Sequence, residues 1–215
     1  VLADGGKTVM AAMIDGRYAG LLAVADRIKP EAGKVVAELA RMGIQPVMLT
    51  GDNERTARAV AANLGIERVI AGVLPEMKAE KVAEESSGGD TVAMVGDGIN
   101  DAPALARADV GIAVGTGADA AKEAAGITIA GSDLSSVVRA IRLSRETMRT
   151  IRLNLFWAFF YNAALIPVAA GVLHQVLWLP AIIRDLHPAL AAAAMAFSSV
   201  SVVANSLRLA KRRID

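Results

Sequence analysis

The stretch AMVGDGINDAPALARADVG, residues 93–111, decides how the first part of this chain folds and what it binds. A short apolar run leads directly into Asp97, Gly98 relaxes the turn, and Asp101 follows four residues after the first carboxylate. Two carboxylates placed after a strand bring together hard oxygen atoms, which are the ligands that Mg²⁺ prefers. Because a cation in such a loop usually serves a phosphate, the stretch predicts a magnesium site for phosphate chemistry.

The segments around this loop alternate between strand and helix patterns. Short apolar strands are predicted at 46–52, 91–98, 110–115 and 126–131, and helices with apolar residues at helical spacing at 31–42 and 53–64. This alternation predicts an α/β fold, a Rossmann-like parallel sheet with helices on both faces. Ligands of such sheets collect at the carboxyl ends of the strands.

Two more polar groups stand near predicted strand ends. Thr50 presents a hydroxyl before the flexible Gly51, and Asp52 or Asn53 is suited to cap the next helix, whose free N–H groups attract anions. Lys78 lies early in another helix and provides a point charge for a phosphate oxygen. Taken singly, these are also features of an ordinary strand–turn–helix junction and of a solvated lysine. Their order along the chain favours a phosphate site.

Charge divides the chain into two parts. Residues 1–138 carry a net charge of −6 and residues 139–215 carry +7, which indicates two different environments. The sequence contains no cysteine, so disulfides and thiolate metal sites are excluded within these 215 residues.

The second part contains two long runs without a formal charge, Leu155–Leu173 with 19 residues and Pro188–Leu207 with 20. Each is long enough to cross a hydrocarbon layer of about 30 Å as a helix. Trp157 and Trp178 stand near the ends of the first run and of the following loop, as interfacial aromatic residues do. A hydrophobic core hairpin of a soluble protein is the alternative. The length of the uncharged runs favours a transmembrane α-helical hairpin.

Basic residues set the expected orientation of this hairpin. One arginine, Arg184, lies between the runs, whereas nine basic residues precede the first run or follow the second: Arg139, Arg142, Arg145, Arg149, Arg152, Arg208, Lys211, Arg212 and Arg213. By the positive-inside rule, both ends are cytoplasmic and the connection is outside.

Three stretches resemble the phosphorylation domain of P-type ATPases, which belongs to the haloacid dehalogenase-like superfamily. They are MLTGDNERTARAVAANLGI, VLPEMKAEKV and MVGDGINDAPALARADVGIAVGTGADAAKEAAGI. The segments NLFWAFFYNAALIPVAAGVL and AAAAMAFSSVSVVANSLRL are similar to the last two membrane helices of the heavy-metal branch, especially its copper-transporting members. The resemblance extends over essentially all 215 residues.

The resemblance implies a role for each matching residue of the first part. Thr50, Gly51 and Asp52 would hold the transferred phosphoryl group, and Lys78 would neutralise its oxygens. Mg²⁺ would bind to Asp97, while Asp101 and Asn100 would complete that site or its second shell. Asp26, in the segment DRIKPEA, would be the hinge to the nucleotide-binding domain. The implied cofactors are ATP and Mg²⁺.

Four side chains inside the two apolar runs are candidates for a transport site: Tyr161, Asn162, Met195 and Ser199. Met195 and Ser199 stand four residues apart and so share a helical face. A thioether favours a soft ion such as Cu(I), although core packing and a helix–helix hydrogen bond explain the same residues from spacing alone. The resemblance favours a metal site, because copper-transporting members share YN and MxxSS here. Members of the zinc type instead carry a lysine and an aspartate in these helices.

The family's nucleophile, the aspartate of a D-K-T-G-T sequence, does not occur in these 215 residues. We therefore expect the nucleophile to lie upstream, in the remainder of the same pump, and the chain alone to be inactive as an ATPase. Two alternatives remain: a soluble haloacid dehalogenase-like phosphatase and a non-catalytic remnant of a P-type ATPase. The expected partners are a heavy-metal ion and the lipid bilayer of the cell membrane, with no nucleic acid.

Together, these expectations divide the chain. Asp15-Gly16 suits a tight turn in the last β-hairpin of the nucleotide-binding domain. The predicted parts are that hairpin (1–25), the phosphorylation domain (26–138), a cytoplasmic connecting helix (139–153), a transmembrane helix (154–174), an extracytoplasmic loop (175–186), a second transmembrane helix (187–208) and a cytoplasmic tail (209–215).

The first prediction concerns topology. A reporter fused after Asp215 should be cytoplasmic and one inserted near Gln175 extracytoplasmic, because basic residues flank the outer ends of both runs. Paired alkaline phosphatase and fluorescent protein fusions measure this. Two reporters on the same side would contradict the transmembrane hairpin.

Overall fold

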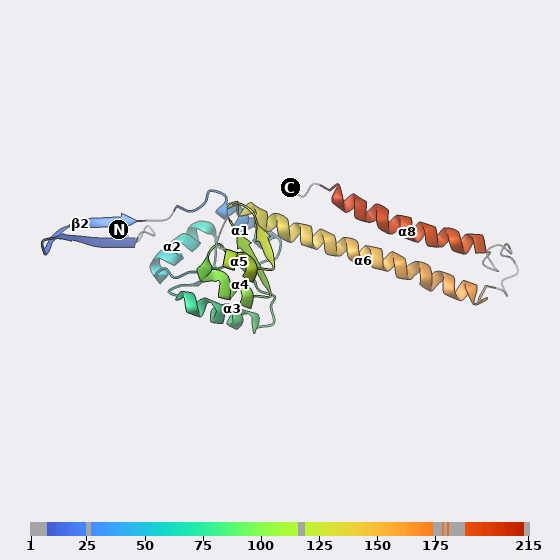
Figure 1. The fold of residues 1–215 in the computed structure, drawn as a ribbon. Helices are drawn as coiled ribbons and strands as arrows, with labels where there is room; N and C mark the ends of the chain where they lie inside the picture. The colour runs from blue at the N-terminus through green and yellow to red at the C-terminus, as the bar shows by residue number, and fades with distance from the viewer. Residues whose placement is uncertain are drawn as a thin grey trace. The chain divides into compact units, whose positions relative to one another are not determined.

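A computed structural model describes residues 8–24, 27–115, 119–173, 178, 180 and 188–212 (Figure 1). The chain divides into two compact units, Val1–Val138 and Arg139–Asp215, which are considered separately below. Asp26, the predicted hinge, lies outside the described residues, as does most of the predicted loop at 175–186.

The first unit begins with an antiparallel hairpin of β1 (Thr8–Ile14) and β2 (Arg17–Val24). The chain turns at Asp15 and Gly16, which both have positive φ angles of 50° and 75°. Two such residues make the type of turn whose twist matches the strands, and it is the turn that the Asp-Gly pair predicts.

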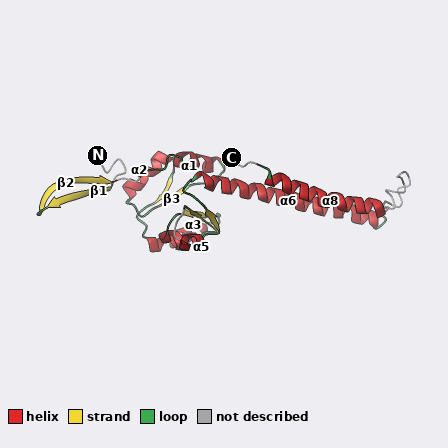
Figure 2. Cartoon of the chain, turned by 45° about the horizontal axis from the view of Figure 1, so that its top comes forward, coloured by secondary structure: helices red, strands yellow, loops and turns green. Residues whose placement is uncertain are grey.

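Parallel strands form the centre of the first unit. Strand β3 (Val47–Leu49) pairs with β4 (Arg68–Ile70), and a second group has the order β5 (Ala93–Gly96), β6 (Val110–Val114), β7 (Ile127–Ile129). Helices flank the strands (Figure 2). They are α1 (Ala32–Arg41), α2 (Glu54–Leu64), α3 (Lys78–Ser86), α4 (Ala102–Arg107) and α5 (Asp119–Ala124), with 3₁₀ turns η2 (Pro75–Met77) and η3 (Ile99–Asp101). The predicted Rossmann-like α/β fold is confirmed.

Local chemistry explains how α2 begins and ends. The Asn53 side chain accepts a hydrogen bond from the Thr56 N–H at 2.9 Å, so Asn53 caps the helix. Gly65 ends it with a φ of 76°, a conformation that suits glycine.

The core of the unit centres on β6, whose Ile112 is 1% exposed. Leu105 of α4 packs against this strand beside Ala113, and a Cβ on Gly111 would lie only 2.5 Å from the Leu105 carbonyl oxygen. Glycine at position 111 therefore lets α4 approach the sheet, which fixes the loop between β5 and α4.

Strand β4 was not among the strands expected from the sequence. It has three residues, as do β3 and β7, which were expected. The strands that were expected are also shorter than predicted, since the flanking glycines and polar residues belong to turns.

The second unit consists of helix α6 (Ser135–Ala169), which starts in the first unit, and helix α8 (Pro188–Ala210). Both are long and apolar enough to cross a membrane. The predicted connecting helix (139–153) and the first predicted transmembrane helix up to Ala169 are one continuous helix, because no glycine or proline interrupts residues 135–166. Residues 170–173, predicted as the end of the transmembrane helix, form turns. Figures 1 and 2 show α6 and α8 side by side.

Candidate functional site

The loop after β3 is held in one conformation by its own hydrogen bonds. The Thr50 hydroxyl donates to an Asp52 carboxylate oxygen at 3.1 Å and accepts from the Asp52 N–H at 3.1 Å. The Thr50 N–H donates to the Ile70 carbonyl at 3.0 Å, and the Gly72 N–H donates to the Asp52 carbonyl at 2.8 Å. Gly51 and Asp52 are exposed, so the loop presents its polar groups to solvent.

An ion pair lies near the ends of two other strands. The Lys78 ammonium donates to an Asp101 carboxylate oxygen at 2.8 Å, and the two side chains are only 17% and 14% exposed. Lys78 begins α3 directly after the turn at Pro75–Met77, and Asp101 is the last residue of η3. The two charges thus neutralise each other in a partly desolvated place, where the attraction is stronger than at the surface.

Gly96, the last residue of β5, is what allows Asp101 to sit there. A Cβ on Gly96 would lie 2.7 Å from the Asp101 Cβ and 2.9 Å from its second carboxylate oxygen. Real atoms do not approach so closely, so every other residue at position 96 would push the Asp101 carboxylate away. The Asp101 N–H also donates to the Gly98 carbonyl at 3.1 Å, which closes the loop.

The remaining predicted ligands of this loop, Asp97 and Asn100, are exposed. Within the described part of the chain, no three acidic or histidine side chains gather as a ready metal site. Mg²⁺ commonly binds to one or two carboxylates and completes its shell with waters and phosphate oxygens, so this donor set fits it. Because one Asp101 oxygen is already engaged by Lys78, Asp97 is the freer ligand of the two carboxylates.

Backbone contacts link the three loops. Gly51 lies against the Val73 carbonyl, since a Cβ there would be 3.4 Å from that oxygen, and the Val73 N–H donates to the Thr50 carbonyl at 3.1 Å. The turn that follows, Pro75–Met77, lies against Ile99–Asp101. The structure therefore joins Lys78 and Asp101 directly. The segment that precedes Lys78 contacts the Thr50 loop through Val73.

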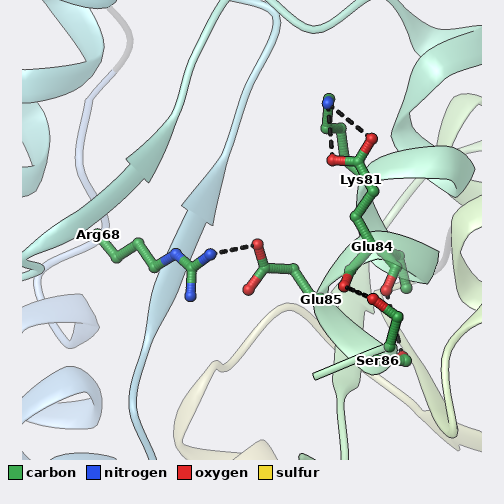
Figure 3. A network of polar contacts seen from close by, with 7 residues as sticks. Arg68, Lys81, Glu84, Glu85 and Ser86 are labelled. Carbon is green, nitrogen blue, oxygen red and sulfur yellow. Dashed lines mark hydrogen bonds and ion pairs between the residues drawn. The ribbon is translucent and has the colours of Figure 1, made fainter. Parts of the chain in front are cut away.

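Helix α3, which carries Lys78, is tied to the sheet at its other end (Figure 3). Arg68 of β4 pairs with Glu85 at 2.6 Å, and Lys81 pairs with Glu84 at 2.7 Å. The hydrogen bond to Glu84 raises the pKa of Lys81 above its usual value. With side chains 52% and 21% exposed, the Arg68–Glu85 pair stabilises the unit by at most about 1 kcal/mol, and mainly orients the helix.

In the second unit, the four predicted transport residues are not all on the contact face between the helices. Tyr161 is half-buried, whereas Asn162 and Ser199 are exposed and Met195 is 69% exposed. Asn162 donates to the Ala158 carbonyl at 2.9 Å and Ser199 to the Met195 carbonyl at 3.3 Å, each within its own helix. The described helices therefore leave three of these four side chains open to further partners.

Two features of the sites were missed from the sequence. The signal for Gly96 was present, because a glycine inside a strand often marks a close approach. The hydrogen bonds of Asn154 with Asn205 and Ser206, which join α6 to α8, had no signal in a one-dimensional pattern.

Comparison with known proteins places the chain in a family. Residues 1–109 match the sequence profile of the haloacid dehalogenase-like hydrolases, and residues 79–141 match a second profile with the same description. The chain belongs to the haloacid dehalogenase-like hydrolase family.

The similar proteins within this family are metal pumps. The chain is 58% identical over 205 residues to the probable copper-transporting ATPase PacS of Synechococcus elongatus, covering 95% of this chain and 27% of that protein. It is 54% identical over 206 residues to the copper-exporting P-type ATPase of Bacillus subtilis, covering 96% and 24%. The resemblance to copper-type P-type ATPases is confirmed, and the chain spans about a quarter of the length of these relatives.

Solved structures also relate the chain to P-type ATPases. The chain superposes on a zinc-transporting PIB-type ATPase in its phosphate-bound E2 state with a TM-score of 0.77 and 34% identity, covering 97% of this chain and 32% of that one. A second structure of a zinc-transporting PIB-type ATPase, in the phosphoenzyme form of that state, gives a TM-score of 0.73 and 36% identity with the same coverage. Both the parallel-sheet unit and the helical hairpin are thus parts of a P-type ATPase architecture.

The second prediction tests the close approach at Gly96. Gly96→Ala should lower the free energy of unfolding by about 1–3 kcal/mol, because the added methyl group displaces the Asp101 carboxylate. Urea titration of the chain in mild detergent, followed by circular dichroism, measures this. Gly33→Ala is the matched control: it lies in α1 with nothing within 4 Å and should be neutral or stabilising by up to about 1 kcal/mol. Equal destabilisation by both would refute the role of Gly96.

Proposed function

We propose that this chain is the C-terminal part of an ATP-driven pump that exports Cu(I) across the cell membrane through an aspartyl-phosphate intermediate. The observation that carries the proposal is similarity over 95% of the chain, at 58% identity, to a probable copper-transporting ATPase. That similarity covers the phosphate-type loops and both apolar helices. A soluble phosphatase would need the first feature but not the second.

The loops of the first unit would act on a phosphoryl group carried by an aspartate outside this chain. Thr50, Gly51 and Asp52 would hold the group through the hydroxyl and backbone N–H groups of the loop, and Lys78 would neutralise its oxygens. Asp97 would hold Mg²⁺, with Asp101 and Asn100 beside it. When bound, Mg²⁺ supplies positive charge that offsets the charge of the phosphoryl oxygens. Such transfer depends on positioning and charge stabilisation, and this set of residues is suited to both.

The Lys78–Asp101 ion pair at 2.8 Å suggests how the charges of the site stay neutralised between turnovers. Without ligands, Lys78 and Asp101 neutralise each other. A phosphoryl group brings negative charge that competes for Lys78, and a cation brings positive charge that competes for Asp101. The two partners can therefore separate only when both ligands are present, which avoids leaving one buried charge alone.

The proposed organisation follows the predicted parts. Residues 1–25 would complete the nucleotide-binding domain, which takes up ATP, and Asp26 would be its hinge to the phosphorylation domain. Residues 1–153 and the C-terminal tail would be cytoplasmic, with the second unit crossing the membrane twice. The upstream remainder of the same pump would supply the nucleophile.

Cu(I) is the proposed cargo because Met195 offers a soft thioether beside the hydroxyl of Ser199, with Tyr161 and Asn162 on the other helix. Zinc is the rival cargo, since the two solved structures are described as zinc-transporting. No charged residue occurs in 155–173 or 188–207, and an uncharged site suits a soft monovalent ion better than a divalent one.

The third prediction tests the pump with a chimera. PacS of S. elongatus, with its matching segment replaced by residues 1–215, should retain Cu(I)-stimulated ATPase activity and an acid-stable phosphoenzyme. Asp97→Asn in this chimera should lower both by at least about a hundredfold, because charge stabilisation of this kind is usually a large part of catalysis. Labelled ATP followed by acid gel electrophoresis measures the phosphoenzyme.

Two controls accompany the chimera. Asp90→Asn removes an exposed carboxylate outside the loop and should leave both activities unchanged. Residues 1–215 alone should hydrolyse no ATP and form no phosphoenzyme, since an in-line nucleophile is needed. A labelled band from the chain alone would mean that one of its own aspartates carries the phosphate.

The fourth prediction concerns the cargo. In the same chimera, Met195→Ala should raise the Cu(I) concentration for half-maximal stimulation by at least about tenfold, because it removes a soft ligand. Met148→Ala, which removes a 46% exposed methionine outside the apolar run, is the control. Equal copper responses in the two variants would indicate that Met195 serves packing and does not bind copper.

A further inference from the structure

Three polar side chains join the two long helices of the second unit. The Asn205 amide donates to the Asn154 side-chain oxygen at 2.7 Å, and the Asn154 amide donates to the Ser206 hydroxyl at 3.1 Å. Ser206 in turn donates to the Val202 carbonyl of its own helix at 2.8 Å. One asparagine of α6 thus uses both ends of its amide on α8.

This arrangement differs from that of Asn162, Ser199 and Ser201, three other polar side chains of the apolar runs. Outside those runs, Glu146 of α6 also pairs with Arg212, just after the end of α8. Asn162, Ser199 and Ser201 bond to carbonyls of their own helix, which satisfies a donor without involving the neighbour. A polar group in an apolar span is costly unless it finds a partner, so bonds that need the opposite helix favour one helix pairing over others.

The half-buried residues show the faces that meet. On α6 they recur at Asn154, Ala158, Tyr161, Leu165 and Val168, and on α8 at Ala194, Ser198, Ser201, Val202, Asn205 and Leu209. Both series have the spacing of three and four residues that antiparallel helices use. Several of these side chains are small, so apolar packing alone distinguishes weakly between one register and a register shifted by two turns.

The polar contacts fix that register. Tyr161 lies seven residues after Asn154, and Ser199 lies seven residues before Ser206. At a rise of about 1.5 Å per residue, both distances are about 10.5 Å along antiparallel helices. Tyr161 is therefore level with Ser199, and Asn162 is level with Ser198.

The contacts also fix which side of the pair each group occupies. At about 100° per residue, Asn162 lies roughly 80° from the middle of the α6 contact face. Met195 and Ser199 lie roughly 70° and 110° from the middle of the α8 contact face. Because the helices are antiparallel, these offsets point to the same side of the pair, so the three exposed side chains share one flank.

We propose that Asn154, Asn205 and Ser206 form a register clamp that positions Tyr161 and Asn162 of α6 against Met195 and Ser199 of α8. They are positioning residues, since they touch one another and not the transport residues. A single polar contact between helices is known to specify register in this way. That this register serves a metal site rests on the proposed copper function. The register itself does not depend on that function.

Disulfide cross-linking tests the register without copper, because these 215 residues contain no cysteine. The matched pair Leu165→Cys/Ala194→Cys places each cysteine eleven residues from the clamp, and the shifted pair Leu165→Cys/Ser201→Cys is displaced by seven. The chain is reconstituted in vesicles of phosphatidylcholine and phosphatidylglycerol and oxidised with tetrathionate. A protease site inserted after Gln175 then shows on a non-reducing gel whether the two helices are joined.

With the clamp intact, the matched pair should cross-link at least about tenfold more than the shifted pair. Asn154→Leu keeps the approximate size and an apolar helix but removes the hydrogen bonds, and should lower this ratio below about twofold. Asn154→Asp still accepts from Asn205, and its second oxygen accepts from the Ser206 hydroxyl once that hydroxyl turns from the Val202 carbonyl, so it should keep the ratio. Asn162→Leu removes an amide that bonds only its own helix, and should also keep it.

An unchanged ratio in Asn154→Leu would overturn the clamp, as would an equal loss in Asn162→Leu. Circular dichroism shows whether each variant keeps its helices. If Asn154→Leu loses helix, Asn154→Asp decides: a lost ratio with helix retained overturns the proposal. A clamp-dependent ratio in a chain whose chimera does not respond to copper would support the register and refute the proposed cargo.

Discussion

The ion pair between Lys78 and Asp101 is the interaction on which the arrangement of the first unit depends. It connects the start of α3 with the end of η3, two places 23 residues apart in the chain, across 2.8 Å. Neither charge is fully exposed, so each needs the other while no ligand is present. Gly96 makes the pair possible by leaving room for the Asp101 side chain, and Arg68 and Glu85 hold the far end of α3 against β4.

The two units satisfy the hydrogen bonds of their polar groups in different ways. In the first unit, the loops bond to themselves and to each other, so Thr50, Asp52, Lys78 and Asp101 are already placed before anything binds. Such preorganisation lowers the cost of arranging charges around a phosphoryl group. In the second unit, one polar cluster is complete between the helices, whereas Asn162, Met195 and Ser199 face outward.

The sequence predicted the features that depend on neighbouring residues. The alternation of strands and helices, the Asp15-Gly16 turn and a cap of α2 at Asp52 or Asn53 all follow from local rules. The structure contains the first two and caps α2 with Asn53. Strand β4, Arg68–Ile70, was not predicted from the sequence. The pairing of Lys78 with Asp101, and of Asn154 with Asn205, depends on how distant segments pack, and no local pattern encodes that.

The outward flank of the helix pair has a consequence for how a membrane protein of this kind is assembled. In hydrocarbon, the amide of Asn162, the hydroxyl of Ser199 and the thioether of Met195 find no partner among lipid tails beyond the carbonyls of their own helices. In the proposed pump, this flank would face other helices of the same protein rather than lipid. The hydrogen bonds of Asn154 with Asn205 and Ser206 would bring α6 and α8 together first, and the open flank would then bind the neighbouring helices.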